Sequence, residues 1–299
     1  MNRGFVAGVL VVVGTVSVAL AGSQQAAGRA VLPDLQKVKD NFYILDASSP
    51  VDRSAFTGGN VGVFVTGNGV VLVDTKLAGY GADILAKIRA VTNKPVTTII
   101  NTHAHGDHTG SNEGFPATVD IVAHENTKAL MLKMDAFKGD KAQFAPKRTY
   151  ADTLTLGSGS DRIDLYYFGP GHTSGDTWVV YPALRLLQTG DMFAWKDAPF
   201  IDRASGGSGV ALPKTLAKAI AGIKGIDTVV PGHSPVMTPK DLQEYQRYTA
   251  DLLAAVEAAK KAGRSAADAA ASINLSAKYP EYKSDRLKAA VEAIYGELQ

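Results

Sequence analysis

The 299-residue chain contains no cysteine. This absence excludes disulfide bonds, thiolate metal ligands and a cysteine nucleophile. Histidine is also scarce, at six residues, and neither sign of charge dominates: 31 Lys and Arg face 29 Asp and Glu, for a formal net charge of +2. A chain without a basic excess is a poor candidate for binding a nucleic-acid backbone. We therefore expect no nucleic-acid partner, and the sequence leaves the oligomeric state open.

The first 21 residues have the layout of a secretory signal peptide. Arg3 precedes an apolar stretch that runs from residue 5 to residue 21 and ends in the small-residue pattern Ala-Leu-Ala. This pattern predicts cleavage after Ala21 and a periplasmic or secreted protein. The alternative is a retained membrane anchor, because about 17 apolar residues lie at the short limit for a spanning helix. After cleavage we expect no stable membrane association.

The pattern of apolar residues in the rest of the chain predicts a layered α/β fold. Residues 70–74 form a continuous apolar run typical of a buried strand, residues 82–91 have helical periodicity, and residues 96–100 form another strand. Residues 22–40 are expected to be a leader segment and residues 135–150 a loop. Further strands are expected at residues 42–45, 60–66, 119–123, 154–156, 163–168, 178–181, 184–187 and 228–230, and helices at 125–133, 213–223, from 239 onward and at 283–298.

Half of the histidines fall directly after the strand predicted at residues 96–100. They form the cluster His103, His105, Asp107 and His108. In an extended segment, side chains two residues apart leave the same face, as His103 and His105 would. Burying three imidazoles and a carboxylate together is costly unless a cation compensates them. The cluster therefore predicts a metal site.

Three more potential ligands occupy the same kind of position downstream. His172, Asp191 and His233 each follow a predicted strand, and each has a glycine beside it. In layered α/β folds, sites gather at strand ends, and glycine allows tight turns there. One Gly-His or Gly-Asp pair alone is weak evidence. Three of them together with the cluster at 103–108 predict one common site.

These residues resemble the metal motifs of the metallo-β-lactamase fold superfamily. The motif H-x-H-x-D-H stands at residues 103–108, the later histidines and aspartate match in order and kind, and Asp74 matches an aspartate that usually holds the metal loop. The resemblance implies a four-layer αββα sandwich over residues 41–238. Residues 239–299 would be a C-terminal helical extension packed on the same domain.

The resemblance also implies a ligand set for two divalent metal ions. The nitrogen and oxygen donors suit zinc, although iron and manganese remain possible. No ligand position is left for the sixth histidine, His124, which we interpret as a helix-start or packing residue. The first metal would be held by His103, His105 and His172, the second by Asp107, His108 and His233, and Asp191 would bridge the two.

A dinuclear site of this kind predicts a hydrolase that acts on a small-molecule substrate. A metal-bound hydroxide would attack an ester, thioester, lactone or β-lactam-type carbonyl, and Asp107 would act catalytically by orienting it. An aspartate at residue 191 looks more like the hydroxyacylglutathione hydrolase branch than the lactam-cleaving members, which often have cysteine there. The alternatives are an iron-dependent redox enzyme similar to sulfur dioxygenases and a non-catalytic metal-binding protein. Residues 193–212, with Trp195 and Phe200, would form either a mobile lid or a plain surface loop.

Overall fold

The computed structural model describes residue 1, residues 29–47 and residues 54–298. The predicted signal peptide and its cleavage site lie outside these ranges. Among the helices that are described, none is both long enough and apolar enough to cross a membrane.

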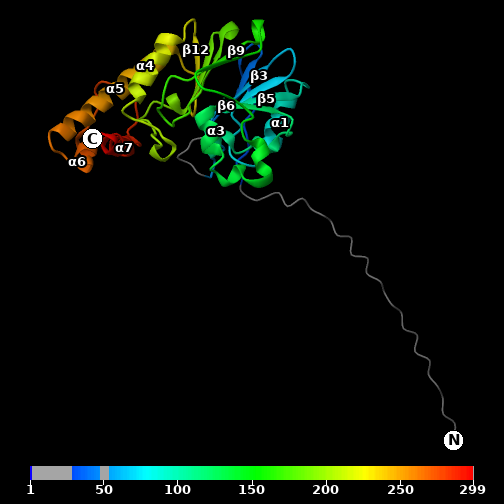
Figure 1. Ribbon diagram of the computed structural model, residues 1–299, viewed down its shortest axis with the longest axis horizontal. Coiled ribbons are helices and arrows are strands. Elements are labelled where there is room, and N and C mark those ends of the chain that lie inside the picture. The colour runs from blue at the N-terminus through cyan, green and yellow to red at the C-terminus, as the bar shows by residue number, and fades with distance from the viewer. Residues whose placement is uncertain (2–28, 48–53, 299) are drawn as a thin grey trace.

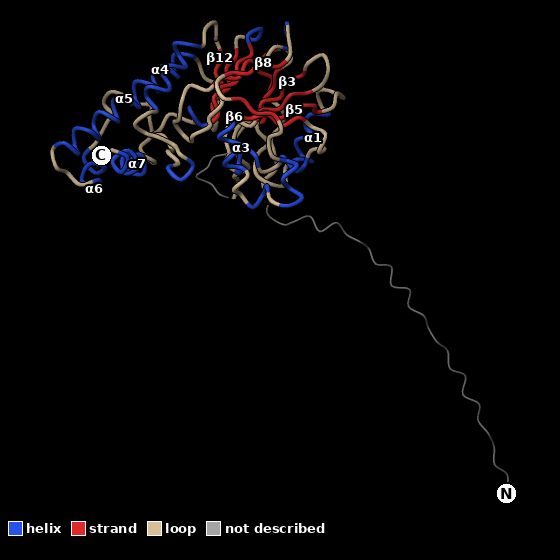
Figure 2. Tube along the Cα trace, viewed as in Figure 1, coloured by secondary structure: helices blue, strands red, loops and turns tan. Residues whose placement is uncertain are grey.

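Two β-sheets form the centre of the described part of the chain (Figure 2). The first sheet has seven strands in sequence order; it is antiparallel from β1 to β4 and parallel from β4 to β7. Its strands are β1 (Gln36–Lys39), β2 (Phe42–Leu45), β3 (Val61–Val65), β4 (Val70–Val73), β5 (Val96–Ile100), β6 (Asp120–His124) and β7 (Arg148–Tyr150).

The second sheet has five strands in the described residues, in the order β12-β11-β10-β9-β8. Neighbouring strands are antiparallel except for β11 and β12, which run parallel. Its strands are β8 (Thr153–Leu156), β9 (Ile163–Tyr166), β10 (Trp178–Tyr181), β11 (Leu186–Gly190) and β12 (Thr228–Pro231).

Strand alternation explains how each sheet is buried on both faces. In β4, Val71 and Val73 belong to the core between the sheets, whereas Val70 and Leu72 pack in the outer core with helix α1 (Gly81–Arg89). Successive side chains of a strand point to opposite faces, so a continuous apolar run supplies both layers. The VVLV run therefore has one core on each side of it.

The second sheet follows the same rule. Val179 and Tyr181 of β10 face the first sheet, while Trp178 and Val180 pack with helices on the outside. These outer helices are α4 (Leu212–Gly222), α5 (Pro239–Lys261) and α7 (Leu287–Glu297).

The helices complete a four-layer arrangement. Figure 1 shows α4 to α7 on the side of the second sheet and α1 and α3 on the side of the first. The predicted αββα sandwich with C-terminal helices is therefore confirmed. The remaining α-helices of the described residues are α2 (Gly106–Thr109), α3 (Glu125–Met131) and α6 (Ala266–Ser272).

Two segments differ from the sequence-based expectation. The expected leader at residues 22–40 contains β1, which pairs antiparallel with β2. The expected loop at residues 135–150 ends in β7, which pairs with β6. Both are edge strands of the first sheet with mostly polar sequences, QKVK and RTY, so neither has the apolar pattern by which a strand is recognised.

Candidate metal centre

The predicted ligands come together at one edge of the sandwich because the strands before them end there. The loop after β5 in the first sheet leads to His103 and His105, and α2 follows with Asp107 and His108. The second sheet contributes one residue after each of three strands. These are His172 after β9, Asp191 after β11 and His233 after β12.

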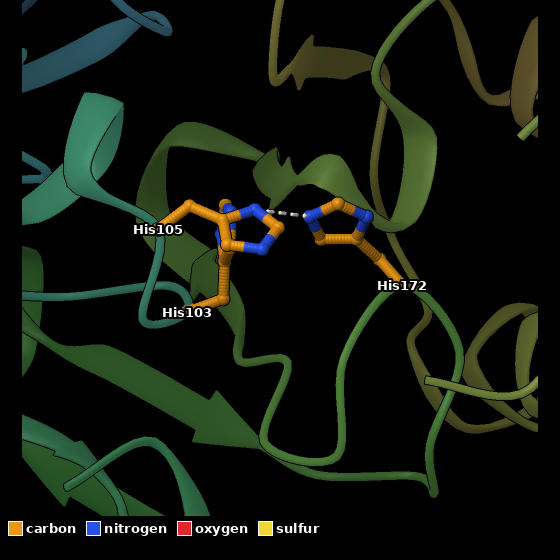
Figure 3. Close-up of side chains that lie close together, drawn as sticks. All are labelled: His103, His105 and His172. Atoms are coloured by element: carbon orange, nitrogen blue, oxygen red, sulfur yellow. Dashed lines mark hydrogen bonds between the residues drawn. The ribbon is translucent and has the colours of Figure 1, made fainter. Parts of the chain in front are cut away.

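Three histidines form a first group of donors, which Figure 3 shows converging from two loops. The Nε2 atom of His172 lies 3.0 Å from Nδ1 of His105. Nε2 of His103 is buried and has no hydrogen-bond partner among the described residues. Burial and the neighbouring His108 lower the pKa of His103 well below its ordinary value. A neutral, unpartnered imidazole nitrogen in this place fits a metal ligand.

Asp107, His108 and His233 form a second group. Nε2 of His233 lies 3.3 Å from Oδ2 of Asp107 and 3.2 Å from Nε2 of His108. The distance from Nε2 of His108 to Oδ2 of Asp107 is 3.6 Å. A carboxylate with two imidazoles at this spacing is a second donor set suited to a divalent cation.

Asp191 lies between the two groups. One carboxylate oxygen is 3.4 Å from Nε2 of His108, and the other is 3.3 Å from Nε2 of His233 and 3.7 Å from Nε2 of His172. Although burial opposes ionisation, His233 and His108 hold the pKa of this carboxyl well below its ordinary value. The chain therefore places a buried carboxylate where it contacts donors of both groups.

Three histidines are oriented by a hydrogen bond on the nitrogen that faces away from the donor groups. Nδ1 of His108 pairs with Oδ2 of Asp74 at 2.8 Å, and Nδ1 of His172 pairs with the carbonyl of Phe200 at 2.8 Å. His105 has the opposite arrangement, since its Nε2 pairs with Oδ2 of Asp202 at 2.8 Å. Such partners fix the ring and leave the other nitrogen available to a metal.

Asp202 is a candidate site residue that the sequence analysis did not identify. It lies on the loop between β11 and α4, 97 positions after His105 in the sequence. A carboxylate that orients a ligand has no motif of its own, so only the folded chain identifies it.

Asp74 connects two loops beneath the site. It accepts hydrogen bonds from the backbone N–H and the hydroxyl of Thr102, at 2.8 and 2.7 Å, in addition to contacting His108. Its backbone is in the left-handed region, with φ of 67°. An aspartate in this conformation stores strain. The arrangement matches the loop-holding role expected for this residue.

The close approach of the Asp191 carboxylate to the backbone explains why residue 232, beside the ligand His233, is a glycine. A Cβ atom on Gly232 would lie 1.9 Å from a carboxylate oxygen of Asp191. Any larger residue would displace the carboxylate that lies between the two donor groups.

His124 lies apart from the donor groups, at the start of α3. Its Nδ1 accepts a hydrogen bond from the backbone N–H of Asn126, and its Nε2 pairs with the carbonyl of Ala151 at 2.7 Å. The ring stacks on Tyr167 with 3.9 Å between centroids. The interpretation of His124 as a helix-start and packing residue is confirmed.

The loop after Asp191 flanks the site with aromatic rings. Trp195 lies 5.5 Å from His233, and Phe200 lies 5.8 Å from His105, between ring centroids. Phe200 is 44% exposed, which is unusual for a large apolar residue in this protein.

The glycine-rich part of that loop is anchored. Gly207 donates to the carbonyl of Asp202 and Ser208 to the carbonyl of Gly171, at 2.8 and 2.9 Å. Glu297 of α7 accepts a hydrogen bond from the backbone N–H of Gly209 at 2.9 Å. These bonds favour the plain-loop interpretation over a mobile lid for residues 205–209.

Comparison with known proteins now identifies the family. A family model described as "Metallo-beta-lactamase superfamily" matches residues 55–233. The chain belongs to this superfamily. It is a metallo-hydrolase of that superfamily, and its His and Asp groups fit a metal site.

Two named relatives are similar to parts of this chain. A "Metallo-beta-lactamase type 2" from Bacteroides fragilis is 24% identical over 200 residues, which cover 67% of this chain and 78% of that protein. A "2,4-dinitroanisole O-demethylase subunit alpha" from a Nocardioides species is 35% identical over 100 residues, 33% of this chain and 29% of that subunit. These names do not support the closer likeness to the hydroxyacylglutathione hydrolase branch that Asp191 suggested.

Solved structures show the same fold. A metallo-beta-lactamase from Pontibacter korlensis has a TM-score of 0.61 at 22% identity, covering 73% of this chain and 98% of its own. One from Hirschia baltica has a TM-score of 0.62 at 18% identity, again covering 73% of this chain and 98% of its own. About a quarter of this chain therefore has no counterpart in them.

We predict that Asp202→Asn weakens zinc binding about 10- to 100-fold, because it removes the charge that orients His105 and raises its basicity. Competition with a chromogenic chelator measures the affinity. Asp227→Asn, a change on the surface pair with Lys39, is the control and should leave zinc affinity unchanged. Equal affinities for wild-type protein and Asp202→Asn would contradict the role of this hydrogen bond.

A buried lysine beside the site predicts a pH-dependent stability. Lys76 is fully buried with φ of 67°, and its Nζ donates to the carbonyl of Asp46. Burial lowers its pKa to about 7, although Asp46 and Asp107 oppose the shift. Between this value and the ordinary value of 10.5, the unfolded chain binds more protons, so the free energy of unfolding rises with pH.

Lys76→Met should therefore stabilise the chelator-treated protein at pH 7.5, and the gain should shrink by up to about 1.4 kcal/mol per pH unit toward pH 9.5. Urea unfolding at the two pH values measures it. The exposed Lys133→Met is the matched control, for which we expect no pH-dependent difference. A gain from Lys76→Met that is the same at both pH values would contradict the lowered pKa.

Proposed function

We propose that this protein is an exported hydrolase that holds two zinc ions and cleaves an ester, thioester, lactone or β-lactam-type carbonyl. One observation carries the proposal: the Asp191 carboxylate lies within 3.3 to 3.7 Å of imidazoles from both donor groups. A buried anion shared in this way suits a bridge between two cations. The names of the metallo-beta-lactamase relatives support a carbonyl substrate.

The ligand roles follow from the two donor groups. Bound zinc would supply Lewis acidity toward the carbonyl and lower the pKa of a shared water. With Asp191 shared, each ion would have four protein donors, and zinc can add a fifth ligand to take up water or substrate. The filled donor set favours the hydrolase over a one-iron redox enzyme. We assign His103, His105 and His172 to the first ion, Asp107, His108 and His233 to the second, and Asp191 to both.

Asp107 is the carboxylate that can act on the attacking water. Its side chain is 20% exposed, compared with 6% for Asp191. Although burial opposes ionisation, His108 and His233 lower the pKa of Asp107 to about 2. An ionised oxygen open to solvent can accept a hydrogen bond from the attacking water and orient this water toward the substrate.

Export is supported by Arg3 and the apolar stretch that ends in Ala-Leu-Ala. We propose a mature chain that begins near Gly22. Amino-terminal sequencing of the secreted or periplasmic protein tests this, and an intact Met1 in the membrane fraction would instead indicate an anchor.

Substitution of Asp107 tests the mechanism. Asp107→Asn keeps the size of the side chain but loses its charge, so we expect kcat to fall by about 100-fold or more in zinc-saturated, leaderless protein. A panel of lactam, lactone, thioester and ester substrates first identifies the activity.

His124→Ala is the matched control, because His124 is buried but lies outside the donor groups. It should leave kcat within a few-fold of wild-type and lower only the stability. If Asp107→Asn retains wild-type kcat while His124→Ala abolishes turnover, the proposed site is wrong.

A further inference from the structure

A cavity of about 420 Å³ adjoins the candidate metal centre on the side of His233. The segment after Asp191 lines it with Trp195 and Asp197, and the segment before α7 lines it with Lys283 and Arg286. This volume lies within the range of small-molecule sites. A substrate with its carbonyl at the donor groups would extend into this cavity.

Arg286 is positioned by aromatic rings at the mouth of the site. Its guanidinium carbon lies 4.1 Å from the centroid of Trp195 and 6.0 Å from that of Phe200. Trp195 in turn contacts His233, and Phe200 contacts His105 and His172. One indole ring therefore separates Arg286 from a residue of the second donor group.

The guanidinium has no carboxylate within 4 Å in the described part of the chain, and its N–H groups donate to none of the described residues. The neighbouring Lys196 differs, because Asp241, Glu244 and Glu281 surround it at 2.6 to 3.5 Å. Stacking on an aromatic ring occupies the face of a guanidinium and leaves its edge free to bind a carboxylate with two hydrogen bonds.

Among the described residues, none of the acidic side chains that line the cavity forms an ion pair with this edge. Glu281 pairs with Lys196. Asp197 accepts hydrogen bonds from the backbone N–H groups of Ala198 and Arg286, and it feels the charge of Arg286 without pairing with the guanidinium. Asp285 is exposed to solvent. Arg286 is thus a half-buried cation, held in place, without a paired anion among the described residues.

We propose that Arg286 binds the carboxylate of an amphipathic substrate whose apolar part lies against Trp195 and whose carbonyl lies at the metal centre. This inference rests on the proposed hydrolase function and names the substrate class for it. Arg286 lies beyond residues 55–233, which the family model matches, so the recognition residue belongs to the C-terminal helical extension. The extension would then set specificity as well as cover the second sheet.

Kinetics with paired substrates test the assignment. Zinc-loaded wild-type protein is compared with Arg286→Met on a carboxylate-bearing substrate and on its methyl ester at the carboxylate. We expect Arg286→Met to lower kcat/KM for the carboxylate about 10- to 100-fold, mainly through KM, and to leave the methyl ester within about twofold. Arg286→Lys should retain part of the preference, since it keeps the charge but loses the planar fork.

Lys288→Met is the matched control, because it removes a nearby exposed cation outside the cavity. It should leave both substrates unaffected. An equal loss of kcat/KM on both substrates with Arg286→Met would overturn the proposal, because it would indicate that Arg286 only holds Trp195 in place.

A binding measurement separates failure of this proposal from failure of the proposed function. Phenylacetate and phenylacetamide are titrated against the same zinc-loaded variants, with tryptophan fluorescence, to which Trp195 contributes, as the signal. We expect wild-type protein to bind phenylacetate at least tenfold more tightly than Arg286→Met does, and phenylacetamide equally. If no substrate is hydrolysed but this difference is found, the anion site stands and the hydrolase proposal fails; equal phenylacetate binding by both proteins overturns the anion site.

Discussion

The fold brings a buried carboxylate, Asp191, against imidazoles that belong to different sheets, and the rest of the site depends on this contact. His108 comes from the first sheet and His172 and His233 from the second, all within 3.7 Å of the Asp191 carboxylate. Unpaired donors at this density are costly to bury. Two cations bound on either side of Asp191 would compensate the cost of burying these donors. The donors come from both sheets, so the site lies where the two sheets meet.

The surroundings of the donors act mainly to fix orientation. Asp74, Asp202 and the carbonyl of Phe200 each pair with one nitrogen of a histidine and thereby select the nitrogen that faces the cluster. The loop after β4 has Asp74 and Lys76 in left-handed conformations. Strain at such positions persists when surrounding contacts over-determine it, as the hydrogen bonds from Thr102 to Asp74 do here.

Sequence patterns were sufficient for the features that depend on local periodicity. The continuous apolar run VVLV predicted a buried strand, and the motif at residues 103–108 predicted where donors gather. Strand β1 was missed because QKVK has no apolar alternation, and because its strand conformation depends on its pairing with β2 in the folded chain. Asp202 and Arg286 were missed for a related reason. Each acts on a residue far away in sequence, through loops whose path only the folded chain defines.

The metal content of the protein tests the central claim most directly. After reconstitution with zinc and removal of excess metal, elemental analysis should give two ions per wild-type chain and fewer than two for Asp191→Ala, because the substitution removes the carboxylate common to both donor groups. His124→Ala should retain two ions. A wild-type plateau at one ion per chain that Asp191→Ala leaves unchanged would contradict a dinuclear centre bridged by Asp191.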